Sequence, residues 1–95
     1  MKIVYTDKIE KSIEKLKDKV AKKRLGVLID KLEKAHNLKE ISNVKPVENN
    51  PNVYRIRAGD YRLFVSYRNG EIIILLLDYK KKNENTYDEF NGILI

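Results

Sequence analysis

The sequence predicts a small α/β domain of the α+β kind, with an N-terminal strand, a helical hairpin and an antiparallel three-stranded meander whose sheet carries the helices on one face. Residues 53–81 hold three apolar-rich runs, separated by Ala58-Gly59-Asp60 and by Asn69-Gly70. Asn-Gly between two alternating runs is the strongest local signal for a hairpin. Apolar residues earlier in the chain recur at helical spacing. Because 95 residues suffice for one modest core, we expect residues 1–95 to form a single domain.

The first third of the chain predicts a short strand followed by two amphipathic helices. Residues 2–5 are β-prone and end at Thr6 and Asp7, which can cap a helix; Glu10 follows Asp7 at the spacing of a capping box. Asp18 can begin the second helix, which runs to about residue 35. The apolar stripes that the two helices bury are Ile9, Ile13, Leu16 and Val20, and then Leu25, Leu28, Ile29 and Leu32.

The remainder of the chain predicts a long connection and then the three strands. Residues 37–52 hold both prolines and read as a connection with one extended piece around residues 41–47. The strands are expected at about residues 53–57, 61–68 and 71–79. Six successive aliphatic residues at positions 72–77 favour a central strand, covered on both faces. Residues 87–90 suggest a short terminal helix, and residues 93–95 an apolar tail that packs on the domain or on a partner.

Composition narrows the classes of function. The chain has 20 Lys and Arg against 14 Asp and Glu, which favours an acidic partner: nucleic acid, an acidic protein or, less favoured, a membrane surface. The alternative is that the charge serves solubility alone. The absence of cysteine excludes disulfides and thiolate metal sites. The single histidine, His36, lies where the second helix ends, and we expect it to interact with the terminal carbonyls. No apolar run is long enough for a membrane span or a signal peptide, so we expect a cytoplasmic protein without a membrane partner.

Strand register predicts a cluster of cations. If the first hairpin has a two-residue Gly-Asp loop, Arg57 lies directly opposite Arg62, and Arg55 shares their face. Counting back from the Asn-Gly turn places Arg62 opposite Leu77. Lys81 follows Leu77 by four residues, so the alternation of side chains places Lys81 on the same face as Leu77. The register therefore gathers Arg55, Arg57, Arg62 and Lys81 at one end of one sheet face, provided that neither hairpin contains a bulge.

Such a cluster suggests a phosphate site. Like charges directly opposite in a sheet repel, so the cluster favours a bound anion, and guanidinium forks suit phosphate oxygens. The alternative is a charged face that protects a sheet edge. The acidic residues show no metal-ligand spacing and there is no Gly-rich phosphate loop, so we expect neither a metal nor a cofactor. RNA cleavage suits this setting, because the 2′-hydroxyl is the nucleophile, cations stabilise a phosphorane and a tyrosine or lysine moves protons.

Residues 54–63, YRIRAGDYRL, resemble the YRIRVGDYRV signature of the RelE/ParE superfamily of toxins from bacterial and archaeal toxin–antitoxin systems. The order of predicted elements is similar over nearly the whole chain. The resemblance implies that the helical hairpin covers one sheet face and that the opposite face is the active surface. It also implies a cognate antitoxin as partner and, for the RelE branch, a toxin that enters the ribosomal A site and cuts mRNA there without a cofactor.

Carried over by position, the resemblance assigns roles to individual residues. Arg57 and Arg62 would act in catalysis on the scissile phosphate. Lys81 stands where many members have an arginine proposed as general acid. A lysine supplies the same charge as an arginine but cannot form the paired hydrogen bonds of a guanidinium group. Tyr87 matches a late tyrosine that orients the RNA base and helps to activate the 2′-hydroxyl. The implied phosphate-binding residues are Arg55, Arg57, Arg62, Lys80 and Lys82.

Two other functions stay open at this point. One is inhibition of DNA gyrase, as in the ParE branch, which commonly lacks the catalytic residues of the RelE branch. The other is a homologue that binds nucleic acid without catalysis, for which the lysine at position 81 is the main support.

Overall fold

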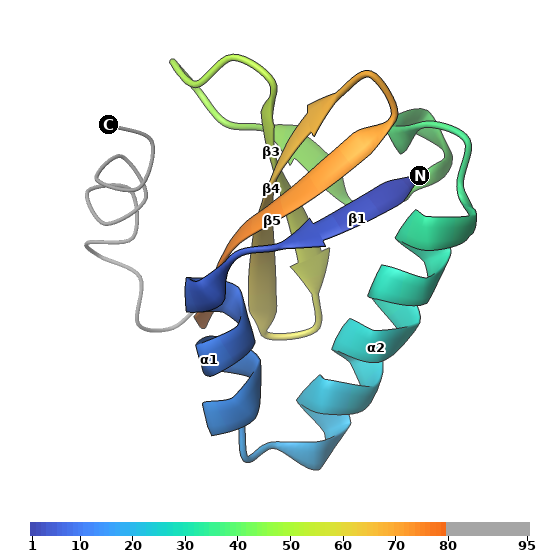
Figure 1. Ribbon diagram of the computed structural model, residues 1–95. Helices are drawn as coiled ribbons and strands as arrows, with labels where there is room; N and C mark the ends of the chain where they lie inside the picture. The colour runs from blue at the N-terminus through green and yellow to red at the C-terminus, as the bar shows by residue number, and fades with distance from the viewer. Residues whose placement is uncertain (80–95) are drawn as a thin grey trace.

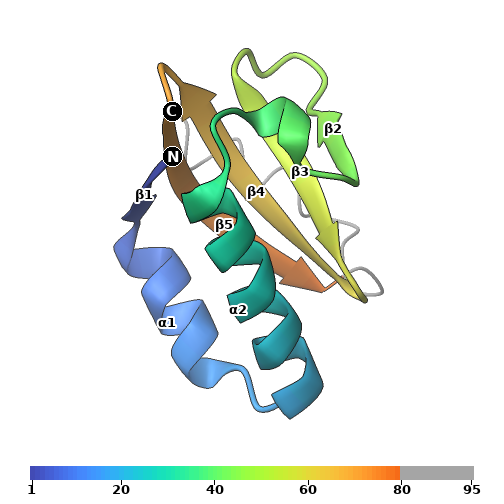
Figure 2. The same ribbon diagram turned by 90° about the vertical axis from the view of Figure 1, so that its right-hand side faces the viewer.

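A five-stranded sheet with two helices on one face makes up the computed structural model, which describes residues 1–79 (Figure 1, Figure 2). The elements follow one another as β1 (Lys2–Tyr5), α1 (Asp7–Lys15), α2 (Lys19–Lys34), the 3-10 helix η1 (Leu38–Glu40), β2 (Val44–Pro46), β3 (Val53–Ala58), β4 (Tyr61–Arg68) and β5 (Glu71–Tyr79). The predicted α+β class is confirmed. The predicted helix at residues 87–90 and the apolar tail at 93–95 lie outside the described residues.

The sheet has the strand order β1-β5-β4-β3-β2. β1 pairs with β5 in parallel, and all other neighbours are antiparallel. The meander β3-β4-β5 therefore forms the centre of the sheet, with β1 and the short β2 at its edges. β5 lies between β1 and β4, as its run of aliphatic residues predicts.

Side-chain caps determine where the helices begin. The Thr6 hydroxyl oxygen accepts a hydrogen bond from the Ile9 N–H at 3.3 Å, so the cap of α1 is Thr6 and not Asp7. The Thr6 hydroxyl also donates to the Ile74 carbonyl at 3.0 Å, which ties the start of α1 to β5. The Asp18 carboxylate accepts from the Ala21 N–H at 3.1 Å and starts α2, as expected. The prediction that Val20 belongs to the buried stripe of the first helix is wrong, because Val20 follows this cap, lies on α2 and is 61% exposed.

Backbone conformation explains the two tight hairpins. Asn69 and Gly70 both have positive φ, 52° and 77°, as a type I′ turn requires. In the β3–β4 turn, Gly59 has φ 63° whereas Asp60 does not have a positive φ, which fits a type II′ turn with glycine first. Both turns thus have the two-residue loops that the sequence predicts.

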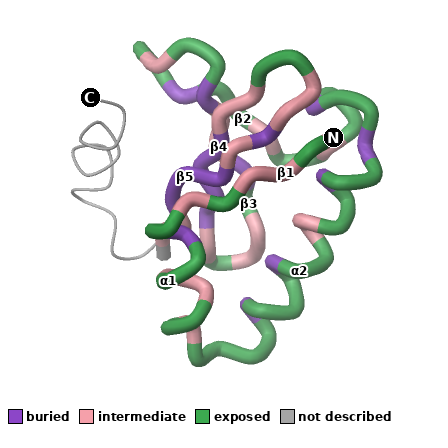
Figure 3. Tube along the Cα trace, in the orientation of Figure 1, coloured by how far each residue is buried: buried purple, intermediate pink, exposed green. Residues whose placement is uncertain are grey.

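Figure 3 marks where the buried residues lie along the chain. Their side chains form two groups on opposite faces of the sheet. The larger core lies between the sheet and the helices, and its buried members are Ile9, Leu25, Leu32, Leu38, Ile56, Leu63, Val65, Ile72 and Ile74. The smaller group contains no residue from α1 or α2; it consists of Val47, Val53, Phe64, Leu75 and Leu76. We call the side of the sheet that carries this second group the open face, because neither helix covers it.

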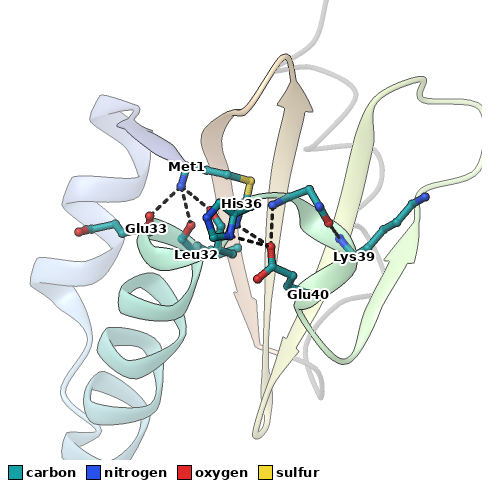
Figure 4. A network of polar contacts seen from close by, with 8 residues as sticks. Met1, Leu32, Glu33, His36, Lys39 and Glu40 are labelled. Carbon is teal, nitrogen blue, oxygen red and sulfur yellow. Dashed lines mark hydrogen bonds and ion pairs between the residues drawn. The ribbon is translucent and has the colours of Figure 1, made fainter.

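The N-terminal amine joins β1 to the end of α2 (Figure 4). The Met1 amine donates hydrogen bonds to three carbonyls there, at 3.3 Å to Leu32, 2.7 Å to Glu33 and 2.8 Å to Ala35. The last carbonyls of a helix have no partner within the helix. Met1 therefore takes the role that the sequence assigned to His36.

His36 instead takes part in the turn that follows α2. The Glu40 carboxylate accepts hydrogen bonds from the backbone N–H groups of His36, at 2.7 Å, and Asn37, at 3.2 Å (Figure 4). The His36 Nδ1 atom also lies 3.5 Å from the same carboxylate oxygen. The hydrogen bond from the His36 N–H is the main reason why the pKa of Glu40 is lowered.

Candidate functional site

A row of charged residues crosses the open face at the end of the central strands that carries the β3–β4 turn. Arg57 on β3 is paired with Arg62 on β4, and Arg62 is paired with Asp78 on β5. The neighbouring residues Ile56 and Leu63 belong to the core under the helices. Because side chains alternate across a strand, the charged row lies on the opposite, open face. The predicted pairing of Arg57 with Arg62 is confirmed.

Arg55 lies on the same face of β3, two residues before Arg57, and is paired with Phe64. The structure thus brings together all three arginines that the sequence predicted for the site. Their environments differ: Arg57 is exposed, Arg55 is half-buried and Arg62 is only 9% exposed. Arg57 is therefore the arginine of this site with the most access to a ligand.

The predicted register between β4 and β5 is wrong at this end of the sheet. The pairing shifts by one residue at Leu75, which has no partner on β4, so Arg62 faces Asp78 and not Leu77. This is a β-bulge, which inserts one extra residue into a strand and reverses the faces beyond it. A run of six aliphatic residues has no alternation that would reveal the bulge in the sequence.

Asp78 is the site residue that the sequence analysis missed. Its carboxylate accepts a hydrogen bond from Arg62 Nη2 at 2.5 Å, and the two side chains are only 15% and 10% exposed. Charge-assisted hydrogen bonds of this kind are short and strong. The repulsion between Arg57 and Arg62, which suggested an external anion, is therefore partly offset by an anion of the chain itself.

The site as a whole remains positive. Lys45 on β2 is paired with Arg55, so it lies on the same face as the three arginines. Counted over the described residues, these four cations and one aspartate, Asp78, leave three net positive charges on this part of the open face. Among residues 1–79, no group of three or more His, Asp or Glu side chains is arranged to hold a metal ion. Within the same residues, neither helix is long and apolar enough to cross a membrane.

Four predicted site residues, Lys80, Lys81, Lys82 and Tyr87, lie outside the described residues. Lys81 was predicted to share the face of Arg62 because Leu77 was expected opposite Arg62, but Asp78 lies there instead. Their roles rest on the sequence resemblance alone and stay predictions.

The sequence matches one family model over most of its length. The model is described as the ParE toxin of the type II toxin–antitoxin system parDE, and it matches residues 3–84. No curated protein matches the sequence.

Solved structures of RelE proteins share this fold. The RelE–RelB complex from Pyrococcus horikoshii OT3 matches with a TM-score of 0.69 and 26% identity, over 85% of this chain and 96% of that chain. The RelB–RelE complex from Methanococcus jannaschii matches with a TM-score of 0.73 and 22% identity, over 92% and 98% of the two chains. A mutant of the Escherichia coli RelE toxin in the free state matches with a TM-score of 0.67 and 18% identity, over 99% and 97%.

Proposed function

Because the chain belongs to the ParE toxin family of type II toxin–antitoxin systems, within the RelE/ParE superfamily, we propose that it is a toxin that stops translation. We propose further that it does so by cutting mRNA in the ribosomal A site. The observation that carries this proposal is the group of three arginines, Arg55, Arg57 and Arg62, on the open face of the sheet. Guanidinium groups around one point suit a phosphate whose negative charge grows in the transition state.

The arginines would act on a cleavage in which the RNA supplies its own nucleophile. The 2′-hydroxyl oxygen attacks the adjacent phosphorus, the bond to the 5′-oxygen breaks, and a 2′,3′-cyclic phosphate and a 5′-hydroxyl remain. Arg57, which is exposed, would bind the scissile phosphate directly. Arg62, whose guanidinium is held by Asp78, would present a fixed charge beside it.

The proton transfers are assigned to residues named by the family resemblance. Tyr87 would orient the base and help to remove the proton from the 2′-hydroxyl. Lys81 would donate a proton to the leaving 5′-oxygen, and Lys80 and Lys82 would add charge near the phosphate. Each step uses a residue of this chain or the RNA itself, so we propose an activity that needs no metal and no cofactor.

A cognate antitoxin is the protein partner that we propose. The RelE chains from Methanococcus jannaschii and Pyrococcus horikoshii were each solved in complex with RelB. The net charge of +6 suits an acidic antitoxin, as it suits the ribosome and mRNA. A toxin that acts on ribosomes would work in the cytoplasm.

Arg57→Ala is the substitution that tests this proposal best. Arg57 is exposed, so its removal leaves the packing of the sheet intact. Arg62→Ala is less informative, because it would leave the Asp78 carboxylate in a largely buried position without this guanidinium. Arg68→Ala is the matched control: Arg68 is also exposed and lies on β4, at the opposite end of the strand from Arg62.

The measurement is inducible expression followed by mapping of mRNA 5′ ends. The wild-type chain should arrest growth and produce new 5′ ends in phase with codons. Arg57→Ala should lower the cleavage rate by about 10²-fold, the usual loss when one transition-state charge contact is removed, whereas Arg68→Ala should cut like the wild type. Undiminished cutting by Arg57→Ala would remove the arginines from the mechanism.

A second candidate function is inhibition of DNA gyrase. The description of the matching family model, which names the ParE toxin, favours it. The contact between Arg62 and Asp78 also favours it, because that contact takes up the charge of one of the three arginines. Inhibition of gyrase supercoiling by the purified protein, without new mRNA ends in expressing cells, would establish this function instead. Harmless expression with neither effect would indicate a homologue that binds nucleic acid without catalysis.

A further inference from the structure

A second pair of cations lies beside the candidate site on the open face. Lys45 on β2 is paired with Arg55 on β3, and Figure 2 shows β2 at the edge of the sheet beside β3. Val44, the residue before Lys45, packs on the core under the helices, so Lys45 belongs to the open face. The Lys45 side chain is exposed and forms no ion pair with any described residue. Lys45 therefore presents its charge to solvent.

The row of residues that contains Lys45 differs from the neighbouring row in its charge. The neighbouring row ends in Asp78, whose carboxylate contacts one of its two arginines. The row of Lys45 and Arg55 continues to Phe64 and Leu76, which are both buried. Like charges directly opposite each other in a sheet repel. The described strands thus supply a carboxylate within one row of cations and leave the other row for an external anion.

Protection of the sheet edge does not account for Lys45. Lysines on edge strands prevent unwanted pairing with other chains. However, β2 is only three residues long, and Pro46 lacks the N–H group that a further strand would need. A lysine that only protected this edge would also gain nothing from its position opposite Arg55.

The spacing of the two rows suits neighbouring phosphates of one nucleic-acid strand. Arg55 and Arg57 are two residues apart on β3, which is about 7 Å along the strand. That distance is close to the separation of successive phosphates in an extended single strand. Because Arg57 is the residue that we assign to the scissile phosphate, Lys45 and Arg55 lie where the next phosphate of the strand would lie.

We propose that Lys45, together with Arg55, binds the phosphate next to the scissile one, an inference that rests on the proposed function. The RNA strand would then cross the open face from the β3–β4 turn towards β2. This neighbouring phosphate does not react, so its contact stabilises the ground state and the transition state equally. Lys45 would thus lower the toxin concentration that cleavage requires without changing the maximal rate.

The first test measures binding to a short labelled single-stranded RNA by fluorescence anisotropy. The RNA carries 2′-O-methyl groups, which remove the nucleophile and prevent cleavage. Lys45→Gln keeps most of the side chain but removes its charge, so it should weaken binding about fivefold, the effect of one exposed charge contact. The slope of log affinity against log salt concentration should also fall by about 0.7, as expected for one phosphate contact on a single strand.

Two further variants control this measurement. Lys45→Arg keeps the charge and should bind the RNA like the wild type. Lys22→Gln is the matched control, because Lys22 is also an exposed lysine but lies on α2, on the other side of the sheet. Its affinity should change by less than about twofold. Equal losses for Lys45→Gln and Lys22→Gln would overturn the proposal, because they would indicate a general effect of net charge.

Thermal melts separate an RNA contact from a structural role. Lys45→Gln removes one of two like charges that face each other, so the variant should be at least as stable as the wild type. A weaker affinity together with an unchanged or higher melting temperature supports the proposal. A lower melting temperature with an unchanged affinity overturns it.

The closing experiment is cleavage of mRNA on ribosomes, with the toxin concentration varied. Lys45→Gln should raise the concentration for the half-maximal rate about fivefold and leave the maximal rate unchanged, whereas Arg57→Ala should lower the maximal rate. An uncharged methylphosphonate linkage is then placed on each side of the cut in turn. On one side it should abolish the difference between Lys45→Gln and the wild type, because the contact is already lost. A lowered maximal rate for Lys45→Gln, or a difference that persists with both linkages, overturns the proposal.

The outcomes distinguish this inference from the proposed function. A wild-type chain that binds the RNA but never cuts mRNA contradicts the proposed function, and the anisotropy of Lys45→Gln then decides whether Lys45 contacts RNA. A wild-type chain that cuts mRNA, with a Lys45→Gln variant that matches it in both assays, contradicts only the role of Lys45. A wild-type chain that neither binds the RNA nor cuts mRNA overturns both.

Discussion

Removal of the Asp78 carboxylate should strongly destabilise the fold. Asp78→Ala takes away the group that faces the Arg62 guanidinium at 2.5 Å, in a place where both side chains are at most 15% exposed. Breaking a buried ion pair by deleting one partner costs about 3–5 kcal/mol, and the residual exposure here favours the low end, about 3 kcal/mol. For a domain of this size, that loss lowers the melting temperature by roughly 12–24 °C.

Urea denaturation followed by circular dichroism measures this loss. The matched control is Glu71→Ala, because Glu71 is also an acidic residue of β5 and forms an ion pair at the other end of the strand. Its contact with Lys2 is long, 3.9 Å, and the two side chains are 41% and 76% exposed. An exposed ion pair contributes about 0–1 kcal/mol. The two variants should therefore differ by at least about 2 kcal/mol in unfolding free energy.

A double-mutant cycle shows whether the pair acts as a unit. Arg62→Ala combined with Asp78→Ala should cost clearly less than the sum of the two single losses, because neither charge is then left behind. Additive losses, or an Asp78→Ala variant as stable as Glu71→Ala, would refute the claim that Asp78 offsets the repulsion in the arginine row.

Two further predictions concern the β3–β4 turn and the 3-10 helix η1. Gly59→Ala should cost about 1–3 kcal/mol, because Gly59 has a positive φ and a Cβ there meets Arg24. Gly70→Ala, with a similar φ but open space, should cost only about 1 kcal/mol in the same denaturation assay, and equal losses would contradict the Arg24 contact. The pKa of Glu40 is lowered in the folded chain, so its contribution to stability is present above its usual value of 4.5 and is lost as the pH falls through the lowered pKa. Melting temperatures measured from pH 7 downwards should therefore fall more steeply below about pH 4.5 for the wild type than for Glu40→Gln; parallel curves would argue against this linkage.

Local chemistry made much of the fold predictable. The Asn69-Gly70 and Gly59-Asp60 turns require positive φ at positions where glycine and asparagine adopt it easily, so both hairpins and their loop lengths follow from the sequence. The pairing of Arg57 with Arg62 follows in turn from the first loop. The parallel pairing of β1 with β5 was not predicted, because no local signal links segments about 70 residues apart.

The unpredicted part of the site depends on one bulge. All residues from 72 to 77 are aliphatic and can face either side of a sheet that is covered on both. The extra residue at Leu75 is therefore invisible in the sequence, although it determines that Asp78, and not Leu77, faces Arg62. The three arginines were predictable as a group, but the carboxylate that holds one of them was not.

A reconstituted cleavage assay tests most directly whether the arginines of the open face promote cleavage of ribosome-bound mRNA. Purified protein is added to ribosomes that hold a labelled mRNA with an empty A site, and the fragments and their ends are analysed. We predict a cut within the A-site codon that leaves a 2′,3′-cyclic phosphate, that requires ribosomes and that is about 10²-fold slower with Arg57→Ala. Intact mRNA in the presence of a protein that arrests growth would contradict the claim.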